Sequence, residues 1–291
     1  MNVASPTLLR KFINLLLYGN FWIALAALSL IGHTSFIFRG QFVLDALVGF
    51  SFFGTLCLYA IHRIIGMSKA HEYFQLNRYT VITRYKFHIE LYAVLGAIGA
   101  GLCFLFLKSN TQLAVVIPSL LSLAYVLPIF GNKKRLRDLD DIKIFLVAGV
   151  WAWITVILPA VEYELLPYRG IVLCFIERTL FVFAITLPFD IRDLSVDGQT
   201  QVKTIPGRIG IYKSKILSAF CLLGAMSIAI VCWWEFYYTF PILVALVVLY
   251  LFTLGLIILT KQERSDYFFT GWLDGTMVLS GVLVGIASYY F

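Results

Sequence analysis

Charged residues are scarce in this sequence. Asp, Glu, Lys and Arg make up 13% of its 291 residues, whereas a soluble globular domain contains about 25%. Apolar residues make up 60%, and the mean hydropathy is +0.88. This composition excludes an ordinary soluble domain and predicts an all-α polytopic membrane protein. We expect residues 1–291 to form a single membrane-embedded domain.

Cysteine is also scarce, and its spacing shows no metal-binding or disulfide pattern. All the cysteines lie within apolar runs, with no C-x-x-C pair and no His pairing; they are Cys57, Cys103, Cys174, Cys221 and Cys232. Free cysteine in such a setting packs as a small apolar residue. We therefore expect small buried side chains at these positions.

Nine apolar runs are separated by polar breaks, and each can span a bilayer as a helix. The first follows Arg10 and Lys11 and continues to about Phe38 without an A-x-A-type cleavage site. It therefore predicts a membrane span rather than a signal peptide. The predicted spans are residues 12–37, 42–62, 88–107, 111–130, 142–161, 168–189, 211–234, 239–260 and 268–290.

Basic residues are distributed unevenly between the connections of these spans. Nineteen Lys and Arg residues fall at the amino terminus and in the loops of the same side, and three fall on the other side. Basic loops remain in the cytoplasm, so this asymmetry predicts a multi-pass protein of the cytoplasmic membrane, with a cytoplasmic amino terminus and an external carboxyl terminus. The net charge of +7 is then explained without nucleic acid. Anionic membrane lipids or an anionic ligand are compatible partners.

Three aspartates follow the sixth apolar run, where such runs normally avoid acid. If the helix continues to about Asp197, then Asp190, Asp193 and Asp197 fall within about 60° of one another on one face. Three like charges on one face repel, and a divalent cation is the simplest compensation. Mg²⁺ fits, because it binds few carboxylates and completes its shell with water and phosphate oxygens. The alternative is a solvated helix end with a turn at Asp197-Gly198.

The segment "DIRDLSVDGQTQVKTIPGRIG" at 190–210 resembles the second aspartate-rich motif of the UbiA superfamily of intramembrane prenyltransferases. That motif is D-x-x-x-D, often preceded by Arg and followed by K-T. The matching residues are Arg192, Asp193, Asp197 and Lys203-Thr204, and Asp274-Gly275 matches a "DG" of the last helix. The number of predicted spans and the long loops after the second and sixth of them agree with the family.

This resemblance implies a nine-helix bundle with a central cavity open to the cytoplasmic side. It implies that Asp190, Asp193 and Asp197 are the catalytic and Mg²⁺-binding residues. The cofactor is then Mg²⁺, and the protein transfers an isoprenyl group from an isoprenyl diphosphate to a hydrophobic or aromatic acceptor. Basic side chains are expected to bind the diphosphate, namely Arg192 and Lys203 near the motif and Lys134 and Arg135 in "KKRLRDLDD" at 133–141.

The first aspartate motif of the family is missing. Its expected place, at the end of the second span, reads "LCLYAIHRIIGMSKAHEYFQLNRY", and no Asp or Glu lies between Asp45 and Glu72. His62 stands where the central Asp belongs. Two interpretations follow. Either His62 and Arg63 bind the diphosphate directly by charge, or the protein no longer performs the ionisation typical of the family.

Two ionisable residues, Glu177 and Arg178, lie in the middle of the sixth span. Such groups usually face the interior of the bundle. We expect Arg178 to pair with Asp45 or with Glu177, or to line a substrate path.

Three functions remain open from the sequence. The first is a prenyltransferase with standard or altered metal use. The second is a catalytically reduced relative that binds isoprenoid lipids or regulates a partner, and the third is an unrelated membrane carrier. Against the carrier, the sequence contains no matched pair of helices broken by Gly or Pro.

The predicted topology can be tested by labelling single cysteines in a cysteine-free background. A cysteine at position 198 should react with a membrane-impermeant maleimide only after the cells are opened, whereas one at position 235 should react in intact cells. Labelling of position 198 from outside would invert the topology.

Overall fold

The structure, a computed structural model, describes residues 8–69, 86–127, 136, 142–199 and 202–290. Its regular elements in these ranges are all helical, and nine segments are long and apolar enough to cross a membrane. These are α2 (Phe21–Arg39), α3 (Ala46–Lys69), α5 (Lys86–Phe104), α6 (Ser109–Val126), α7 with η4 and α8 (Ile142–Ala152, Trp153–Ile157 and Leu158–Glu162), α9 (Tyr168–Gln199), α11 (Ile211–Trp234), α12 (Phe240–Leu259) and η5 with α13 (Tyr267–Leu273 and Asp274–Tyr290). The predicted all-α class and the predicted number of spans are confirmed within these ranges.

The first predicted span is wrong at its start. Residues 12–37 form two helices rather than one, because the chain breaks after α1 (Leu8–Tyr18) at Gly19-Asn20. Asn20 takes a left-handed conformation with φ of 66°, which Asn tolerates better than most residues. The break leaves the last carbonyl groups of α1 without partners within that helix.

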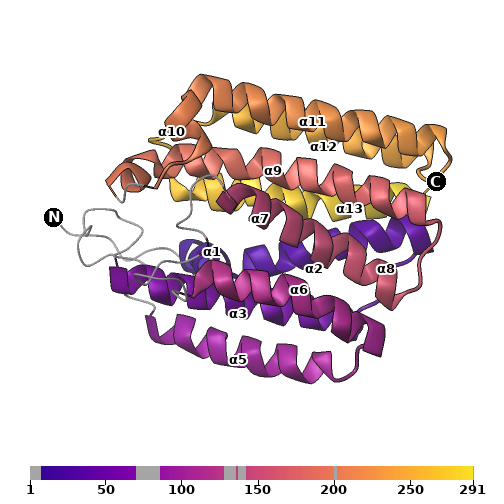
Figure 1. Cartoon of the computed structure of the whole chain (residues 1–291), viewed down its shortest axis with the longest axis horizontal. Coiled ribbons are helices and arrows are strands. Elements are labelled where there is room, and N and C mark those ends of the chain that lie inside the picture. The colour runs from indigo at the N-terminus through magenta and orange to yellow at the C-terminus, as the bar shows by residue number, and fades with distance from the viewer. Residues whose placement is uncertain (1–7, 70–85, 128–135, 137–141, 200–201, 291) are drawn as a thin grey trace.

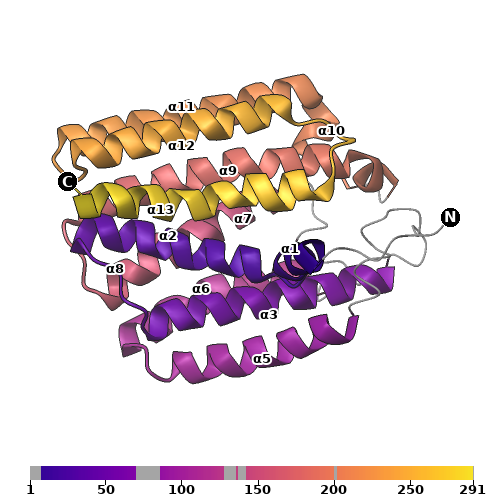
Figure 2. The same ribbon diagram turned by 180° about the vertical axis from the view of Figure 1, so that it is seen from behind.

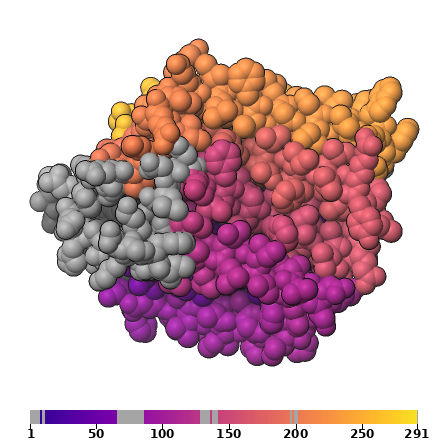
Figure 3. Space-filling model, in the orientation of Figure 1, coloured from indigo at the N-terminus to yellow at the C-terminus, as the bar shows by residue number. Residues whose placement is uncertain are grey.

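The spans form layers that run in the same general direction (Figure 1). α11 and α12 lie at one edge and α3 and α5 at the opposite edge, and the view from behind shows α13 beside α2 (Figure 2). α9 lies between these edges and packs against both α7 and α11. In the space-filling view, atoms of α6 and α7 lie on the face between α5 and α11, with those of α8 and α9 beside them (Figure 3).

α9 is the longest helix, and it carries the aspartates. It continues through Pro188 to Gln199, beyond the end of the predicted span at 189, so the condition for placing the three aspartates on one helix is met. The short helix α10 (Ile205–Ile209) follows and packs against α9. The segment "VKT" at 202–204, just before α10, is thereby brought back beside the aspartates.

Arg178 of α9 is almost fully buried in the middle of the bundle, with 1% of its surface exposed. Its Nη1 donates to the carbonyl of Leu30 at 3.0 Å and to the hydroxyl of Thr155 at 3.1 Å. Thr155 lies in the π-helical turn η4, a geometry often found at special positions in helices. The expected ion pair is absent, because neither Asp45 nor Glu177 lies within ion-pair distance of Arg178 in the described part of the chain. Asp45 caps α3 and accepts from Tyr163 instead.

Glu177, the neighbour of Arg178, is satisfied by tyrosines from another part of the bundle. Tyr238 donates to Glu177 Oε2 at 2.5 Å, and the hydroxyl of Tyr250 donates to Oε1. A buried acid and a buried base that are adjacent in sequence thus bind to different helices. Both side chains tie α9 to its neighbours in the region where lipid offers no hydrogen bonds.

The contact between α2 and α13 depends on a glycine. A Cβ atom on Gly281 would lie 2.1 Å from the carbonyl oxygen of Ser29, so only glycine permits this approach of the two backbones. The hydroxyl of Ser29 donates to the carbonyl of Val278 at 2.6 Å in the same place. Small residues and interhelical hydrogen bonds of this kind drive helix association within membranes.

Replacement of Gly281 by alanine should therefore destabilise the bundle. The added methyl group meets backbone rather than a flexible side chain, so we expect a loss of about 1–3 kcal/mol, the range for overpacking, measured as thermal unfolding in nanodiscs. Gly255→Ala in α12 is the matched control, because its added Cβ would meet no atom within 4 Å apart from its chain neighbours and the backbone of its own helix. Equal effects of the two substitutions would contradict this account of the α2–α13 contact.

Candidate functional site

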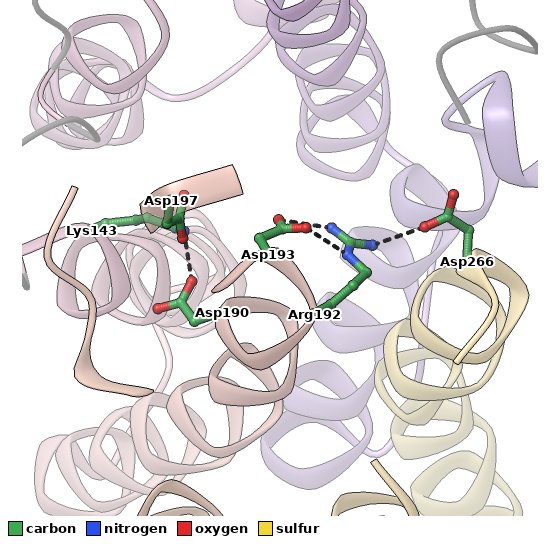
Figure 4. A network of polar contacts seen from close by, with 6 residues as sticks. All are labelled: Lys143, Asp190, Arg192, Asp193, Asp197 and Asp266. Carbon is green, nitrogen blue, oxygen red and sulfur yellow. Dashed lines mark hydrogen bonds and ion pairs between the residues drawn. The ribbon is translucent and has the colours of Figure 1, made fainter. Parts of the chain in front are cut away.

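Lys143 joins two of the three aspartates at the end of α9. Its Nζ lies 2.6 Å from Asp190 Oδ1 and 3.9 Å from Asp197 Oδ2 (Figure 4). The side chains of Lys143, Asp190 and Asp197 are only 12%, 3% and 12% exposed. The contact with Asp190 is an ion pair rather than a well-directed hydrogen bond. One ammonium group thus occupies a position on which two carboxylates converge.

Asp193 belongs to a second charge network. Arg192 donates to both of its oxygens, from Nε at 2.9 Å and from Nη2 at 3.1 Å. Nη1 of Arg192 also reaches Asp266 Oδ1 at 3.4 Å, at the start of η5 (Figure 4). The guanidinium lies over the rings of Phe189 and Phe269, about 5 Å from each centroid. Bidentate pairing and the aromatic rings hold Arg192 in one orientation.

The predicted three-aspartate face is therefore divided between two cations. The helix brings Asp190, Asp193 and Asp197 to one end of α9, as expected, but Lys143 takes two of them and Arg192 the third. No group of three metal-binding side chains converges within the described residues. The pair formed by Asp190 and Asp197 nevertheless has the oxygen ligands that Mg²⁺ prefers.

Lys203 and Thr204, the predicted K-T pair, lie beside Asp190. With Lys143 they line a small cavity of about 10 Å³, close to the smallest volume that holds one water molecule. The hydroxyl of Thr204 is buried and has no hydrogen-bond partner in the described part of the chain. A buried polar atom without a partner is costly, so this hydroxyl is suited to an added oxygen ligand or water.

Arg63 is engaged at the end of α1. It donates to the carbonyl groups of Tyr18 at 2.8 Å and Leu17 at 3.0 Å. Its charge also acts on Asp266 and Asp274, so it lies on the same side of the bundle as the Arg192 network. Burial, together with the charge of Asp266, raises the pKa of Tyr18 to about 12, and its phenol is protonated at neutral pH.

His62 and Arg63 point to different sides of α3. The His62 ring stacks on Tyr125 of α6, with ring centroids 6.1 Å apart and planes at 24°. It lines a pocket between α3, α6 and α7, away from the end of α1 that Arg63 contacts. The predicted diphosphate residues Lys134 and Arg135 lie outside the described residues.

Sequence reasoning missed Lys143 and Asp266. Lys143 follows directly on a charged loop, and in the sequence it counted only as one more basic residue of that side. Asp266 stands before the ninth span with no recognisable motif. Their contacts with Asp190 and Arg192 arise because α7 and η5 lie beside the end of α9. No local sequence pattern predicts that placement.

Comparison with known proteins gives no matching family model and no matching curated sequence. Solved structures do match. A UbiA homologue from Archaeoglobus fulgidus bound to DMAPP and Mg²⁺ has a TM-score of 0.67, 11% identity, and coverage of 96% of this chain and 99% of its own. A UbiA homologue from Aeropyrum pernix K1 has a TM-score of 0.63, 14% identity, and coverage of 92% and 96%. A digeranylgeranylglyceryl phosphate synthase has a TM-score of 0.61, 14% identity, and coverage of 97% and 99%.

These similarities extend over nearly the whole of each chain. At such low identity they establish the fold, which is the helical membrane bundle of the UbiA homologues. The predicted UbiA-like fold is thus confirmed.

The role of Lys143 can be tested through stability. Lys143→Met leaves Asp190 and Asp197 buried without their cation, and breaking a buried ion pair from one side costs about 3–5 kcal/mol. We expect a lower thermal midpoint for Lys143→Met in a buffer with a divalent-ion chelator. Adding Asp190→Asn should restore part of the loss.

Lys108→Met is the matched control for this test. Lys108 Nζ lies 2.7 Å from Glu164 Oε1, a distance close to that of the buried pair, but both side chains are more than half exposed. Exposed ion pairs contribute little to stability. If Lys143→Met is no more destabilising than Lys108→Met, the buried pair does not hold the end of α9.

Proposed function

We propose that this protein is an intramembrane prenyltransferase, which transfers an isoprenyl group from an isoprenyl diphosphate to a hydrophobic or aromatic acceptor. The observation that carries the proposal is the convergence of Asp190 and Asp197 on one cation position, beside the lysine and threonine of the K-T pair. The UbiA fold supports it, since a structure with that fold binds DMAPP and Mg²⁺.

The residues at the end of α9 fit a divalent cation. Two carboxylate oxygens already face one positive charge, and the unpartnered hydroxyl of Thr204 lies next to them. We propose that Asp190, Asp193 and Asp197 hold Mg²⁺, with Asp193 available once Arg192 turns away. Bound Mg²⁺ would supply positive charge to the departing diphosphate.

The remaining roles belong to basic side chains. Arg192 has a fixed planar guanidinium suited to phosphate oxygens, and Lys203 lies beside Asp190. We propose that both bind the diphosphate and that Lys143, when displaced from the two aspartates, joins them. The diphosphate contacts of Arg63, His62, Lys134 and Arg135 stay predictions. For Arg63 they require it to leave the carbonyl groups of Leu17 and Tyr18.

One observation favours the second candidate, a catalytically reduced relative that binds isoprenoid diphosphates without turnover. Lys143 and Arg192 already neutralise the aspartates, and the end of α3 presents His62 and Arg63 rather than carboxylates. Product analysis by mass spectrometry distinguishes the two candidates. The enzyme yields a prenylated acceptor, whereas the binding protein returns its donor intact.

Donor binding tests the proposed site. Calorimetry should show that geranyl diphosphate binds wild-type protein in nanodiscs with Mg²⁺ and at least tenfold more weakly with a chelator. In Asp190→Asn with Asp197→Asn this dependence on Mg²⁺ should disappear, because both carboxylates that face the cation are lost.

Asp45→Asn is the control for that measurement. Asp45 is also an aspartate near the end of a membrane helix, but it caps the start of α3, the end of that helix opposite His62 and Arg63. Its replacement should leave the effect of Mg²⁺ unchanged. Retention of Mg²⁺-dependent binding in the double variant would move the site elsewhere.

A further inference from the structure

The short helix α1 lies across the spans rather than along them. It has 11 residues, and only Gly19 and Asn20 separate its end at Tyr18 from the start of α2 at Phe21. In Figure 2, α1 is viewed nearly along its axis, whereas the spans lie in the plane of the picture. Because α2 is a membrane span and the link is short, α1 lies close to the level at which the bilayer begins.

One face of α1 is both apolar and exposed. Its residues are Leu8, Leu9, Phe12, Ile13 and Leu15, of which Leu8 is 85% and Phe12 57% exposed. At about 100° per residue they cover an arc of about 160°, and no polar residue of α1 falls inside it. Such a face is unfavourable in water, but the boundary between headgroups and acyl chains accepts it.

Two basic residues border this face. By its position on the helix, Lys11 falls about 40° beyond one edge of the arc, and Arg10 falls about 60° beyond the other. Basic residues around an apolar face are typical of helices that lie in the plane of a membrane surface. At that level they attract the phosphate groups of anionic lipids.

The inner face of α1 packs beside an exposed tryptophan. Leu17 is buried, and its Cδ1 lies next to Gly271 of η5, 3.9 Å from where a Cβ on that glycine would be. The next residue, Trp272, is 60% exposed. Tryptophan is enriched at membrane interfaces, so this ring marks the same level as α1.

Polar contacts hold α1 to the end of the bundle that carries the candidate site. Arg63 donates to two carbonyl groups at the carboxyl end of α1, and the hydroxyl of Tyr267 donates to Asn14 Oδ1 at 2.5 Å. Asp266, the residue before Tyr267, contacts Arg192. A lipid at α1 would therefore bind next to elements that hold both arginines.

We propose that α1 is a membrane-surface helix that binds anionic phospholipids. Its outer apolar face is inserted among the acyl chains, and Arg10 and Lys11 pair with the lipid phosphates. The ligand is a lipid of the surrounding bilayer rather than a free phosphate, because the exposed apolar face needs hydrocarbon. This inference does not depend on the proposed prenyl transfer.

Insertion can be measured with an environment-sensitive fluorophore on single cysteines in a cysteine-free background. Phe12→Cys places it on the apolar face. Glu263→Cys is the control, because this exposed residue lies in the turn between α12 and η5, at the same end of the bundle. In nanodiscs with lipids brominated in their acyl chains, we expect quenching about threefold stronger, or more, at position 12 than at position 263.

The preference for anionic lipid can be measured through stability, because a ligand that binds the folded state raises its unfolding midpoint. We expect the thermal midpoint to rise by about 2–4 °C when phosphatidylglycerol replaces part of the phosphatidylcholine in the nanodisc. Arg10→Gln with Lys11→Gln should abolish this rise. Lys261→Gln with Arg264→Gln should retain it, because it removes the same charge from exposed positions at the same end of the bundle.

Several results would overturn the inference. Equal quenching at positions 12 and 263 would place α1 outside the lipid. Absence of the rise in wild-type protein, its persistence in Arg10→Gln with Lys11→Gln, or its loss in the control pair would exclude lipid binding at α1. Disulfide formation between two copies at position 12, without quenching, would assign the face to a second copy of this chain.

Inorganic phosphate separates the two sources of the anion. Added to phosphatidylcholine nanodiscs, it should leave the midpoint of wild-type protein unchanged. A rise equal to that with phosphatidylglycerol would show that α1 binds a free anion, and the lipid proposal would then be wrong.

Discussion

The structure depends on the polar contacts that the charged side chains of α9 make with the rest of the bundle. Lipid supplies no hydrogen bonds, and an unpaired ion in a membrane is costly. Arg178 donates hydrogen bonds to a carbonyl of α2 and a hydroxyl of η4, and Glu177 accepts hydrogen bonds from two tyrosine hydroxyls. The aspartates at the end of the helix form ion pairs with Lys143 and Arg192. These contacts join α9 to the helices around it. The charged side chains of α9 therefore find their partners only when the bundle assembles.

The same requirement prepares the proposed site. Lys143 offsets the repulsion between Asp190 and Asp197 at this end of the helix, as a divalent cation would. We propose that Mg²⁺ replaces the Lys143 ammonium at these two carboxylates, so that its binding needs no new carboxylate. The displaced lysine would then remain beside the site, where its charge suits a diphosphate.

His62 and Arg63 of α3, which stand where carboxylates are expected, contact different parts of the structure. Arg63 completes the end of α1, a helix that exists separately because the chain breaks at Asn20. His62 faces the pocket between α3, α6 and α7 on the opposite side. The two adjacent residues that replace the expected motif therefore serve different neighbours.

The sequence by itself determined the helical membrane class and the number of spans, because hydropathy is a local property that one segment displays without its neighbours. The UbiA-like fold was indicated separately, by the resemblance of the segment at 190–210 to a family motif. Only the tertiary structure decided that Lys143 pairs with Asp190 and that Arg192 pairs with Asp193 and Asp266. It also decided that Arg178 donates to the carbonyl of Leu30 and pairs with neither of the two predicted acids. Each of these partners comes from another helix or from a choice of side-chain rotamer. Several oppositely charged groups compete as partners, and they come within contact distance only in the assembled bundle.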